Sequence, residues 1–550
     1  MVSAKSIRYA AVLCTLAFWA SCTPGGGGDS GGAPAPVLPP FTVNTVFPAA
    51  DSVNVSRTQG LNVVFTRTVD PDSITSTTFT LESASGLVPG AVAGFSNVAT
   101  FTLQSPLAPL TTYVATLTKD VRALSGKTLG QDYTWTFTTL DRTWSTPLPL
   151  EGEAGSVSDH GLASNRVGDA VAFWRQTVNG EQGVYLFPFT PQDDWSGPFK
   201  LDPAGGGLAY APQVSIDDSG AIVAIWRETG ATATSLWSRR YLPGSGWENA
   251  EELSSITSAF DGIDLALGPT GLGYVIYLRQ GVVGNSGDVF RSHDPQTGWG
   301  DEQLPGQIAQ ADAAVTNASG RTVHAASYYN PATGSGNAIS RTYDPGVGWS
   351  TWTLGPGFSQ PNIVLSTIDD AGNTILLWEQ NANNGLKAIV WNRYSWGDAW
   401  SGTTAITSPT TGARAPAIGG IGSGRTLIAW EQGESGQNTS IRFVVFDPAT
   451  SFSTPSPLND APVNAESGAS VSMDSQGRTL VAWTEHQFPW IVRSRHFDPS
   501  TGWSTPITVA SDPQQASFDS KICLFPDGRA VAVTLRGNST PFDLVFSLLE

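Results

Sequence analysis

Two kinds of hydrophobic pattern alternate along residues 143–550. One is a short run in which nearly every residue is apolar, as in AIVAIW at 221–226 and TLVAW at 479–483. The other alternates polar and apolar residues, as in STPITV at 504–509. A continuous apolar run of this length predicts a strand buried on both faces, and an alternating run predicts a strand with one solvent-exposed face. The pattern therefore predicts an all-β region whose sheets cover one another.

The apolar runs belong to a repeated unit. A tight Gly turn precedes each run, as in DDSG at 217–220, because hairpins need backbone angles that Gly adopts at low cost. A third strand, such as SLWSRRYL at 235–242, leads to an Asp-Pro or Gly-rich turn and a Trp, and the alternating tail follows as a fourth strand. Four strands of about six residues with their loops make about 50 residues.

Two sets of marker residues share this period. The Trp after the turn, replaced once by Phe, recurs at intervals of 50 to 52 residues, at 144, 195, 247, 299, 349, 400, 452 and 503. The Gly of the tight turn recurs in a second register, at 168, 220, 271, 320, 372, 424, 477 and 528. Two independent registers with one period indicate eight units.

The length and content of each unit predict a β-propeller blade, in which four strands are covered by the neighbouring blades. The region opens with a fourth-strand tail, STPLPL at 145–150, and stops after a third strand, FDLVFSLL at 542–549. An N-terminal strand would therefore complete the last blade and remove two exposed sheet edges. We expect an eight-bladed β-propeller closed in this way. The repeated Trp is expected to pack between blades.

Residues 41–140 show shorter β-rich runs, separated by turn signals at the spacing of a sandwich. In TYVATLT, alternation places Tyr113, Ala115 and Leu117 on one face, and in YTWTFTT it does the same for Trp135 and Phe137, together with Tyr133. With VFPAADSVNVS near the start, FTRTVDPDSIT, PLAPLTTYVATLT and the closing WTFTT, this stretch resembles the SbsA-type bacterial Ig-like domain. The resemblance implies a β-sandwich that serves as a spacer or adhesive unit, without catalytic residues.

The first 22 residues predict export. Lys5 and Arg8 precede an apolar run at 9–20 that is too short to span a bilayer and is typical of a signal peptide. The run ends in Ala-Ser-Cys, which resembles the lipobox of bacterial lipoproteins. The resemblance implies a lipid attached to Cys22, and Thr23 after the cysteine points to the outer membrane. The alternative is an ordinary secreted protein cleaved nearby.

The remaining organisation follows from composition. The Gly- and Pro-rich residues 23–40 cannot bury a core and predict a flexible tether. The formal net charge of −18 opposes binding to nucleic acid and unaided docking on anionic lipid. Cys523 is the single cysteine of the body and is expected to be a small buried hydrophobe. The expected order is a signal peptide at 1–22, a tether at 23–40, an Ig-like domain at 41–140 and a propeller at 143–550.

Polar residues follow the apolar second strand in several units and are candidates for a ligand site. Arg forks and carboxylates beside Trp suit sugars, which need aromatic faces and paired hydrogen bonds. The other interpretation is that they are solvated strand ends or form salt bridges between blades. The candidates are Arg175, Arg227, Glu228, Arg279, Glu379, Glu431 and Glu485.

The sequence contains no catalytic motif that we recognise, and we expect no metal site and no cofactor. The five histidines share no repeat position, and Asp217-Asp218 and Asp369-Asp370 are better explained as turn residues than as calcium ligands. The leading hypothesis is a lipid-anchored envelope protein whose propeller binds a protein or a glycan, with the Ig-like domain as a stalk. A propeller glycoside hydrolase or lyase, and a purely structural envelope component, remain as alternatives.

Overall fold

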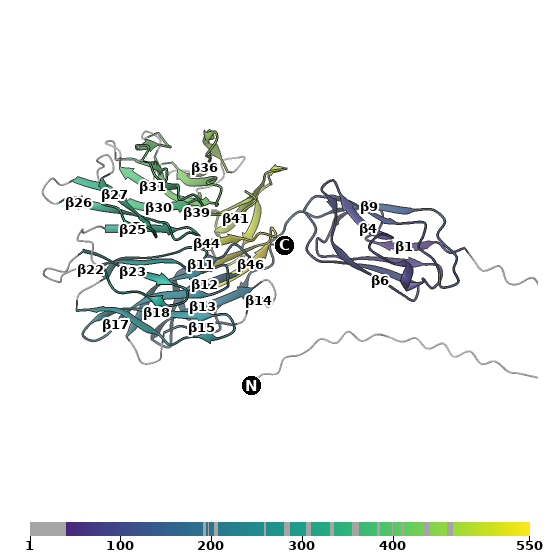
Figure 1. The fold of residues 1–550 in the computed structure, drawn as a ribbon, viewed down its shortest axis with the longest axis horizontal. Helices are drawn as coiled ribbons and strands as arrows, with labels where there is room; N and C mark the ends of the chain where they lie inside the picture. The colour runs from purple at the N-terminus through teal and green to yellow at the C-terminus, as the bar shows by residue number, and fades with distance from the viewer. Residues whose placement is uncertain are drawn as a thin grey trace, which may run out of the picture. The chain divides into compact units, whose positions relative to one another are not determined.

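The computed structural model describes residues 40–549, except for 154, 191–193, 196, 203–206, 258–259, 280–286, 304–309, 331–334, 355–361, 382–384, 399, 409–411, 434–438 and 459–465. The predicted signal peptide, Cys22 and residues 23–39 lie outside the described residues. The described chain consists of strands and one 3₁₀ turn, η1 (Pro71–Ser73), and forms two compact units (Figure 1). One unit contains the residues up to Gln104 with Thr111–Thr139, and the other contains Ser105–Leu110 with residues 140–550. No helix in this part of the chain is long and apolar enough to cross a bilayer.

The first unit contains two β-sheets. One sheet has the order β1 (Val43–Phe47), β3 (Leu61–Phe65), β7 (Val98–Leu103), β6 (Gly90–Phe95). The other has the order β2 (Ser52–Val55), β9 (Tyr133–Thr139), β8 (Thr112–Leu117), β4 (Phe79–Ser83), β5 (Gly86–Leu87).

The predicted faces of β8 and β9 are confirmed. Tyr113, Ala115 and Leu117 are buried along β8, and Trp135 and Phe137 are buried along β9. Tyr133, at the start of β9, is 36% exposed although it shares the alternation of the other two. A strand end reaches beyond the core, so period alone does not fix burial at its first residue.

The second unit contains eight sheets among the described residues, which we number in chain order. The strands of sheets 1 and 2 are β11 (Ser156–Ser164), β12 (Ala170–Val178), β13 (Glu181–Thr190), β14 (Asp194–Trp195), β15 (Phe199–Lys200); β16 (Leu208–Ile216), β17 (Ile222–Thr229), β18 (Thr234–Leu242), β19 (Gly246–Trp247), β20 (Glu251–Ile256). The strands of sheets 3 and 4 are β21 (Phe260–Leu267), β22 (Gly273–Arg279), β23 (Gly287–Asp294), β24 (Gly298–Trp299); β25 (Gln310–Thr316), β26 (Thr322–Asn330), β27 (Ser335–Asp344), β28 (Gly348–Trp349), β29 (Thr353–Leu354).

Sheets 5 to 8 follow the same order. The strands of sheets 5 and 6 are β30 (Asn362–Ile368), β31 (Thr374–Asn381), β32 (Lys387–Tyr394), β33 (Thr404–Ala405); β34 (Ala413–Gly420), β35 (Thr426–Gln432), β36 (Ser440–Asp447), β37 (Ser451–Phe452), β38 (Ser456–Pro457). The strands of sheets 7 and 8 are β39 (Glu466–Met473), β40 (Thr479–Glu485), β41 (Ile491–Asp498), β42 (Gly502–Trp503), β43 (Ile507–Ala510); β44 (Ser517–Leu524), β45 (Ala530–Arg536), β46 (Asp543–Leu549) and β10 (Leu148–Pro149).

The order of strands and turns in each sheet follows the sequence pattern. The apolar second strand is buried on both faces, as in β17, where Ile222 to Trp226 are buried. The turn before it needs the left-handed conformation of Gly220 at φ 83°. The Asp217 carboxylate accepts backbone N–H groups of Ser219 and Ala221 at 2.8 and 3.0 Å, which fixes this turn. This aspartate is therefore a turn residue, as the sequence indicated.

The repeated Trp packs between neighbouring sheets, as predicted. Trp247 of sheet 2 stacks on Phe199 of sheet 1, with ring centroids 5.1 Å apart. The Trp299 indole of sheet 3 donates a hydrogen bond to the Ser238 hydroxyl of sheet 2 at 2.9 Å. The fourth strand differs in detail from the expectation, because in sheet 2 it is split into β19 and β20, which both pair with β18.

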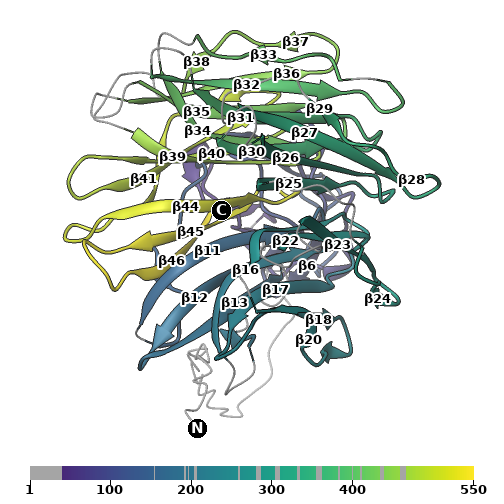
Figure 2. The same ribbon diagram turned by 90° about the vertical axis from the view of Figure 1, so that its left-hand side faces the viewer.

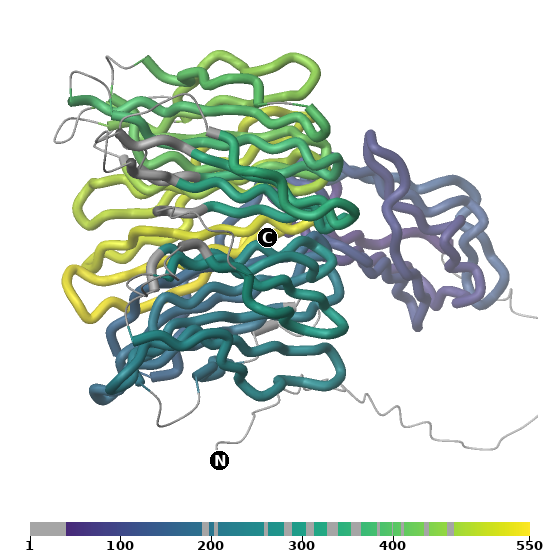
Figure 3. Tube along the Cα trace, turned by 60° about the vertical axis from the view of Figure 1, so that its left-hand side comes forward, coloured from purple at the N-terminus to yellow at the C-terminus, as the bar shows by residue number. Residues whose placement is uncertain are grey.

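The sheets follow one another in chain order around one circuit (Figures 2 and 3). The first strand of each sheet contacts the first strand of the next, and β44 of sheet 8 contacts β11 of sheet 1. The opening tail also takes its predicted place, since β10 pairs antiparallel with β46 through Leu148 with Phe546 and Pro149 with Val545. The start and the end of this unit therefore share one sheet.

Candidate functional site

The sheets have two different ends. At one end, which we call the turn end, lie the Gly turns between first and second strands. The opposite end, which we call the bulge end, carries a register shift in all eight first strands of the described chain. Several bulge residues have a positive φ, such as Asp159 at 50° and Ala415 at 47°. Bulges re-aim side chains and are common beside functional sites.

All seven candidate residues lie near the bulge end, because each follows the buried part of a second strand. They do not form one ring of equivalent groups. Arg175, Arg227, Glu379 and Glu431 occupy the first position after the aromatic marker, whereas Glu228, Arg279 and Glu485 occupy the second. Since successive side chains of a strand point to opposite faces, the two sets face different neighbouring sheets.

Glu379 and Glu431 bridge neighbouring sheets. The Glu379 carboxylate accepts a hydrogen bond from the Lys387 ammonium in its own sheet and from the Ala415 N–H in sheet 6, both at 2.5 Å. The Glu431 carboxylate pairs with Arg414 at 2.7 Å and accepts from the Gly468 N–H of sheet 7 at 2.9 Å.

These two side chains are only 2% and 7% exposed. A buried carboxylate needs a partner for its charge and hydrogen bonds for its remaining lone pairs, and both glutamates have them. Each ion pair lies within one sheet, and the contact with the next sheet is a hydrogen bond from a backbone N–H, so these two glutamates do not form the salt bridges between blades that the sequence suggested.

Three other candidates are paired locally. Arg175 donates to the Ser158 hydroxyl at 2.9 Å and forms an ion pair with Asp159 at 3.0 Å. Arg279 forms an ion pair with Glu302. Glu485 lies 3.4 Å from Arg493 on the next strand.

Arg227 and Glu228 are adjacent on β17, so their side chains point to opposite faces of sheet 2. The Arg227 guanidinium lies over the Tyr210 ring at 5.3 Å. The Glu228 carboxylate accepts the Gly207 N–H at 2.6 Å and so holds the start of β16 against β17.

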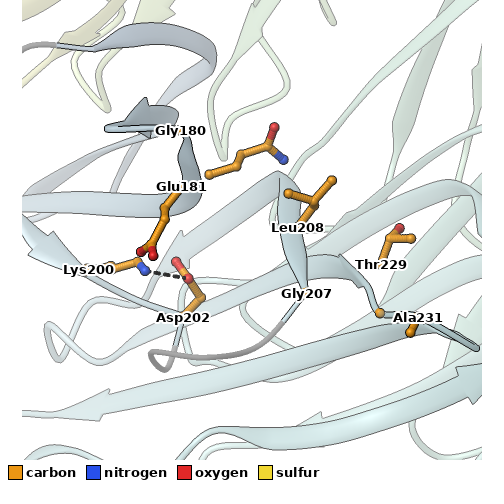
Figure 4. Close-up of a pocket in the computed structure, with 10 residues that line it drawn as sticks. Gly180, Glu181, Lys200, Asp202, Gly207, Leu208, Thr229 and Ala231 are labelled. Carbon is orange, nitrogen blue, oxygen red and sulfur yellow. Dashed lines mark ion pairs between the residues drawn. The ribbon is translucent and has the colours of Figure 1, made fainter.

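Gly207 is one wall of an open groove between sheets 1 and 2 (Figure 4). The groove has a volume of about 610 Å³ and is built from the β12–β13 hairpin, β15, the start of β16 and the residues after β17. Its lining residues are Gly180, Glu181, Gln182, Lys200, Asp202, Gly207, Leu208, Thr229, Gly230 and Ala231.

The groove combines charged groups with one exposed apolar side chain. Lys200 and Asp202 form an ion pair at 3.2 Å inside it, and the Asp202 carboxylate also accepts the Val184 N–H at 2.6 Å. Leu208 on the opposite wall is 56% exposed. Fixed hydrogen-bond donors and acceptors beside an apolar surface are features of a binding site for a small polar ligand. Sequence reasoning did not single out Lys200 or Asp202, because neither belongs to the repeated phrase.

The turn end holds a second hollow, of about 260 Å³, lined by first-strand ends of sheets 1 and 3 to 8. Arg166 of sheet 1 donates to Asp218 of sheet 2 at 2.6 and 2.8 Å. The same guanidinium lies 3.8 Å from Asp370 of sheet 5, four sheets further along the chain. Both carboxylates neutralise the arginine, so this hollow has no surplus positive charge for an anionic ligand.

Acidic and histidine side chains are scattered rather than clustered. Within the described ranges, no group of three His, Cys, Asp or Glu side chains is arranged to hold a metal ion. Cys523 is buried as expected, and burial raises the pKa of its thiol to about 12.

Solved structures that are similar to this chain include a lectin, a propeller domain of a protease and a sialidase. The BP39L lectin from Burkholderia pseudomallei is 17% identical, with a TM-score of 0.42 over 64% of this chain and 99% of its own. The β-propeller domain of the Trilobed protease from Pyrococcus furiosus is 8% identical, with a TM-score of 0.40 over 65% and 99%. The NanB sialidase from Streptococcus pneumoniae is 10% identical, with a TM-score of 0.33 over 90% and 95%. At TM-scores below 0.5, no conclusion about this chain rests on these likenesses.

Sequence comparison gives a result for the first unit only. No curated protein matches the chain. The sequence model of one family, the bacterial Ig-like domain, matches residues 38–139. These limits agree with the predicted domain at 41–140 to within three residues, and the two-sheet structure of this segment agrees with the match. Residues 38–139 are a bacterial Ig-like domain.

Proposed function

We propose that this protein is an exported envelope lipoprotein whose larger unit is an eight-bladed β-propeller that binds a protein or a glycan. The lipid on Cys22 anchors it, and the Ig-like domain serves as a stalk.

 The support for the propeller is the circuit of contacts from sheet 1 to sheet 8 and back to β11, together with the pairing of β10 with β46. The outer-membrane location is inferred from the resemblance of the leader to that of bacterial lipoproteins and from Thr23 after the cysteine.

The observation that favours a binding function most is the groove in Figure 4. It is open to solvent, and the Lys200–Asp202 pair and the Glu181 and Gln182 side chains line one of its sides. Glu228 acts on the groove indirectly, because its hydrogen bond to the Gly207 N–H positions the opposite wall. Arg175, Arg227 and Arg279 are the other candidates that we propose as ligand contacts at the bulge end.

Glu379, Glu431 and Glu485 are also among the proposed site residues, but we expect them to contribute less to ligand binding than the arginines. Their contacts with neighbouring strands suit a packing role, so their replacement should lower stability before it changes binding. The seven candidates can therefore be sorted by one pair of measurements, binding and melting temperature.

The test is an array of neutral and acidic oligosaccharides, probed with the full chain without its signal peptide. We expect binding to at least one class of oligosaccharide and no release of product. Lys200→Ala should weaken this binding at least tenfold, because Lys200 lines the groove. Lys521→Ala is the matched control, since Lys521 is a similarly exposed lysine paired with Asp519 at the bulge end of sheet 8.

Four outcomes would overturn the proposal in different ways. Equal binding by the Lys200→Ala and Lys521→Ala variants would remove the groove as the site. Release of shortened sugars would replace the binding module by a glycoside hydrolase or lyase. Absence of binding to the whole array, combined with failure to capture a protein from an envelope extract, would favour the alternative that the protein is a purely structural component of the envelope. A Cys22→Ser variant that still partitions into detergent would overturn the lipid anchor.

A further inference from the structure

The bulge end of sheets 7 and 8 carries a row of aromatic side chains that the repeated pattern does not include. We call His486, Phe488, Trp490, Phe518 and Phe542 the aromatic row. His486 and Trp490 are stacked, with centroids 4.4 Å apart and planes at 17°. Trp490 meets Phe518 edge-on at 6.0 Å, and Phe518 meets Phe542 edge-on at 5.2 Å. The row therefore runs from the β40–β41 hairpin across sheet 8.

The row is held in place by polar contacts at its base. The Ser467 hydroxyl is hydrogen-bonded to Nε2 of His486 at 2.6 Å. The Trp490 carbonyl accepts the Ser517 N–H of β44 at 2.9 Å, which ties the hairpin of sheet 7 to sheet 8. The aromatic rings are thus presented on two sheets that are joined to each other.

Much of this aromatic surface is exposed. Phe488 is 85% exposed and Trp490 is 38% exposed, although aromatic side chains of this size bury most of their area in a protein core. Exposed aromatic groups that are gathered in one place mark a contact surface for another molecule.

The charges beside the row are balanced. Arg414 is paired with Glu431 at 2.7 Å, and Arg493 is paired with Glu485 at 3.4 Å. Such a surface offers hydrogen-bond donors and acceptors without a surplus of either charge, so it does not favour a polyanion or a polycation.

We propose that the aromatic row is a binding platform for a neutral saccharide. The apolar C–H face of a pyranose ring packs against the ring of Trp490 or Phe488. Its hydroxyl groups exchange hydrogen bonds with polar side chains beside the row, among them Gln487 and Arg493. This platform lies on sheets 7 and 8 and is separate from the groove between sheets 1 and 2, so each is tested by its own variants.

The test measures the retardation of the full chain, without its signal peptide, in native gels that contain a neutral polysaccharide. The probes are dextran, a soluble β-1,3-glucan and a galactomannan, with heparin as the charged comparison. We expect retardation by at least one neutral polymer and no retardation by heparin. Trp490→Ala and Phe488→Ala should each raise the apparent dissociation constant at least tenfold.

Two controls separate this platform from folding and from the groove. Phe95→Ala removes an aromatic side chain of similar exposure, 82%, from the Ig-like unit and should leave retardation unchanged. Lys200→Ala should also leave it unchanged, because Lys200 lies in the groove of Figure 4. Phe488 is so exposed that its replacement should preserve the melting temperature. Retardation by none of the neutral polymers, retardation by heparin alone, or equal retardation of the Phe488→Ala variant would overturn the proposal.

Discussion

The Trp144 indole donates a hydrogen bond to the Ser494 hydroxyl at 2.8 Å, although 350 residues separate them in the sequence. Trp144 precedes β10 and forms a bridge to Leu549 in sheet 8, whereas Ser494 lies on β41 of sheet 7. Trp299 makes the same contact with Ser238 between sheets 3 and 2. The junction between sheets 8 and 7, which the N-terminal segment completes, is therefore built like a junction within the repeats.

This equivalence predicts that Ser494→Ala and Ser238→Ala have similar costs. Each change removes the acceptor of a partly buried indole N–H, which should lower the free energy of unfolding by about 1 kcal/mol. Urea denaturation of both variants measures the two costs. A loss at Ser238 without a loss at Ser494 would show that the N-terminal segment does not take part in the cooperative unit.

A second prediction concerns the segment around β10. Leu150 is 2% exposed and packs in a cluster with Trp174, Phe187 and Leu544, between sheets 8 and 1. Leu150→Ala should lower the free energy of unfolding by about 2–4 kcal/mol, because it leaves a cavity in that cluster. Leu148 on the same segment is 53% exposed, so Leu148→Ala is the control and should change stability by less than about 0.5 kcal/mol. Equal effects of the two changes would contradict the docking of this segment.

A third prediction concerns an arginine on the third strand that joins neighbouring sheets. Arg291 donates from Nε to the Gly300 carbonyl of its own sheet and from Nη1 to the Leu253 carbonyl of sheet 2, both at 2.8 Å. Arg239 makes the equivalent pair of contacts with Glu248 and Leu201. Lysine cannot reach two carbonyls with a planar fork.

Arg291→Lys should therefore lower the free energy of unfolding by about 1–2 kcal/mol, since one carbonyl at the junction loses its donor. Arg529, which pairs with Asp527 two residues away, is the matched control. Arg529→Lys should have little effect, because an exposed local pair contributes about 0–1 kcal/mol. Chemical denaturation of both variants makes the comparison, and an equally small effect at Arg291 would argue against a role between sheets.

The sequence predicts the repeated architecture well because each repeat contains the pattern of strands and turns that forms one sheet. Buried second strands, Gly turns and the Trp at one period predict the eight sheets, and the tail at 145–150 predicts the pairing of β10 with β46. The arginines at 239, 291 and 495 were missed, although their spacing follows the same period. A search for recurring charged residues on the third strand would have found them.

The candidate site was harder to predict, because it depends on contacts between repeats. The sequence grouped Arg279 with Arg175, but Leu278 intervenes after Tyr277, so Arg279 lies on the other face of its strand. Glu379 meets the Ala415 N–H only because a bulge in β34 turns that group toward sheet 5. The groove and the aromatic row arise from hairpins in which one repeat differs from the others, and a periodic pattern carries no information about such differences.

The last prediction concerns the pH dependence of stability. Burial raises the pKa of Glu151 from 4.5 to about 6, and the nearby Asp543 carboxylate acts in the same direction. Glu151 also accepts the Leu544 N–H at 2.9 Å, so it lies beside the strand that pairs with β10. Because the folded protein binds this proton more tightly than the unfolded chain, the stabilisation is complete below about pH 4.5 and is lost as the pH rises through about 6.

Glu151→Gln removes this titration while keeping an oxygen that accepts the Leu544 N–H. The variant should match the wild type at pH 4 and exceed its free energy of unfolding by about 1–2 kcal/mol at pH 7.5. The exposed Glu153 two residues away supplies the control, because Glu153→Gln removes the same charge from a side chain that is not buried at this junction. Urea denaturation at both pH values measures the difference. A Glu151→Gln variant that is less stable than the wild type at pH 7.5 would show that the ionised carboxylate stabilises this junction, which is the opposite of what its burial implies.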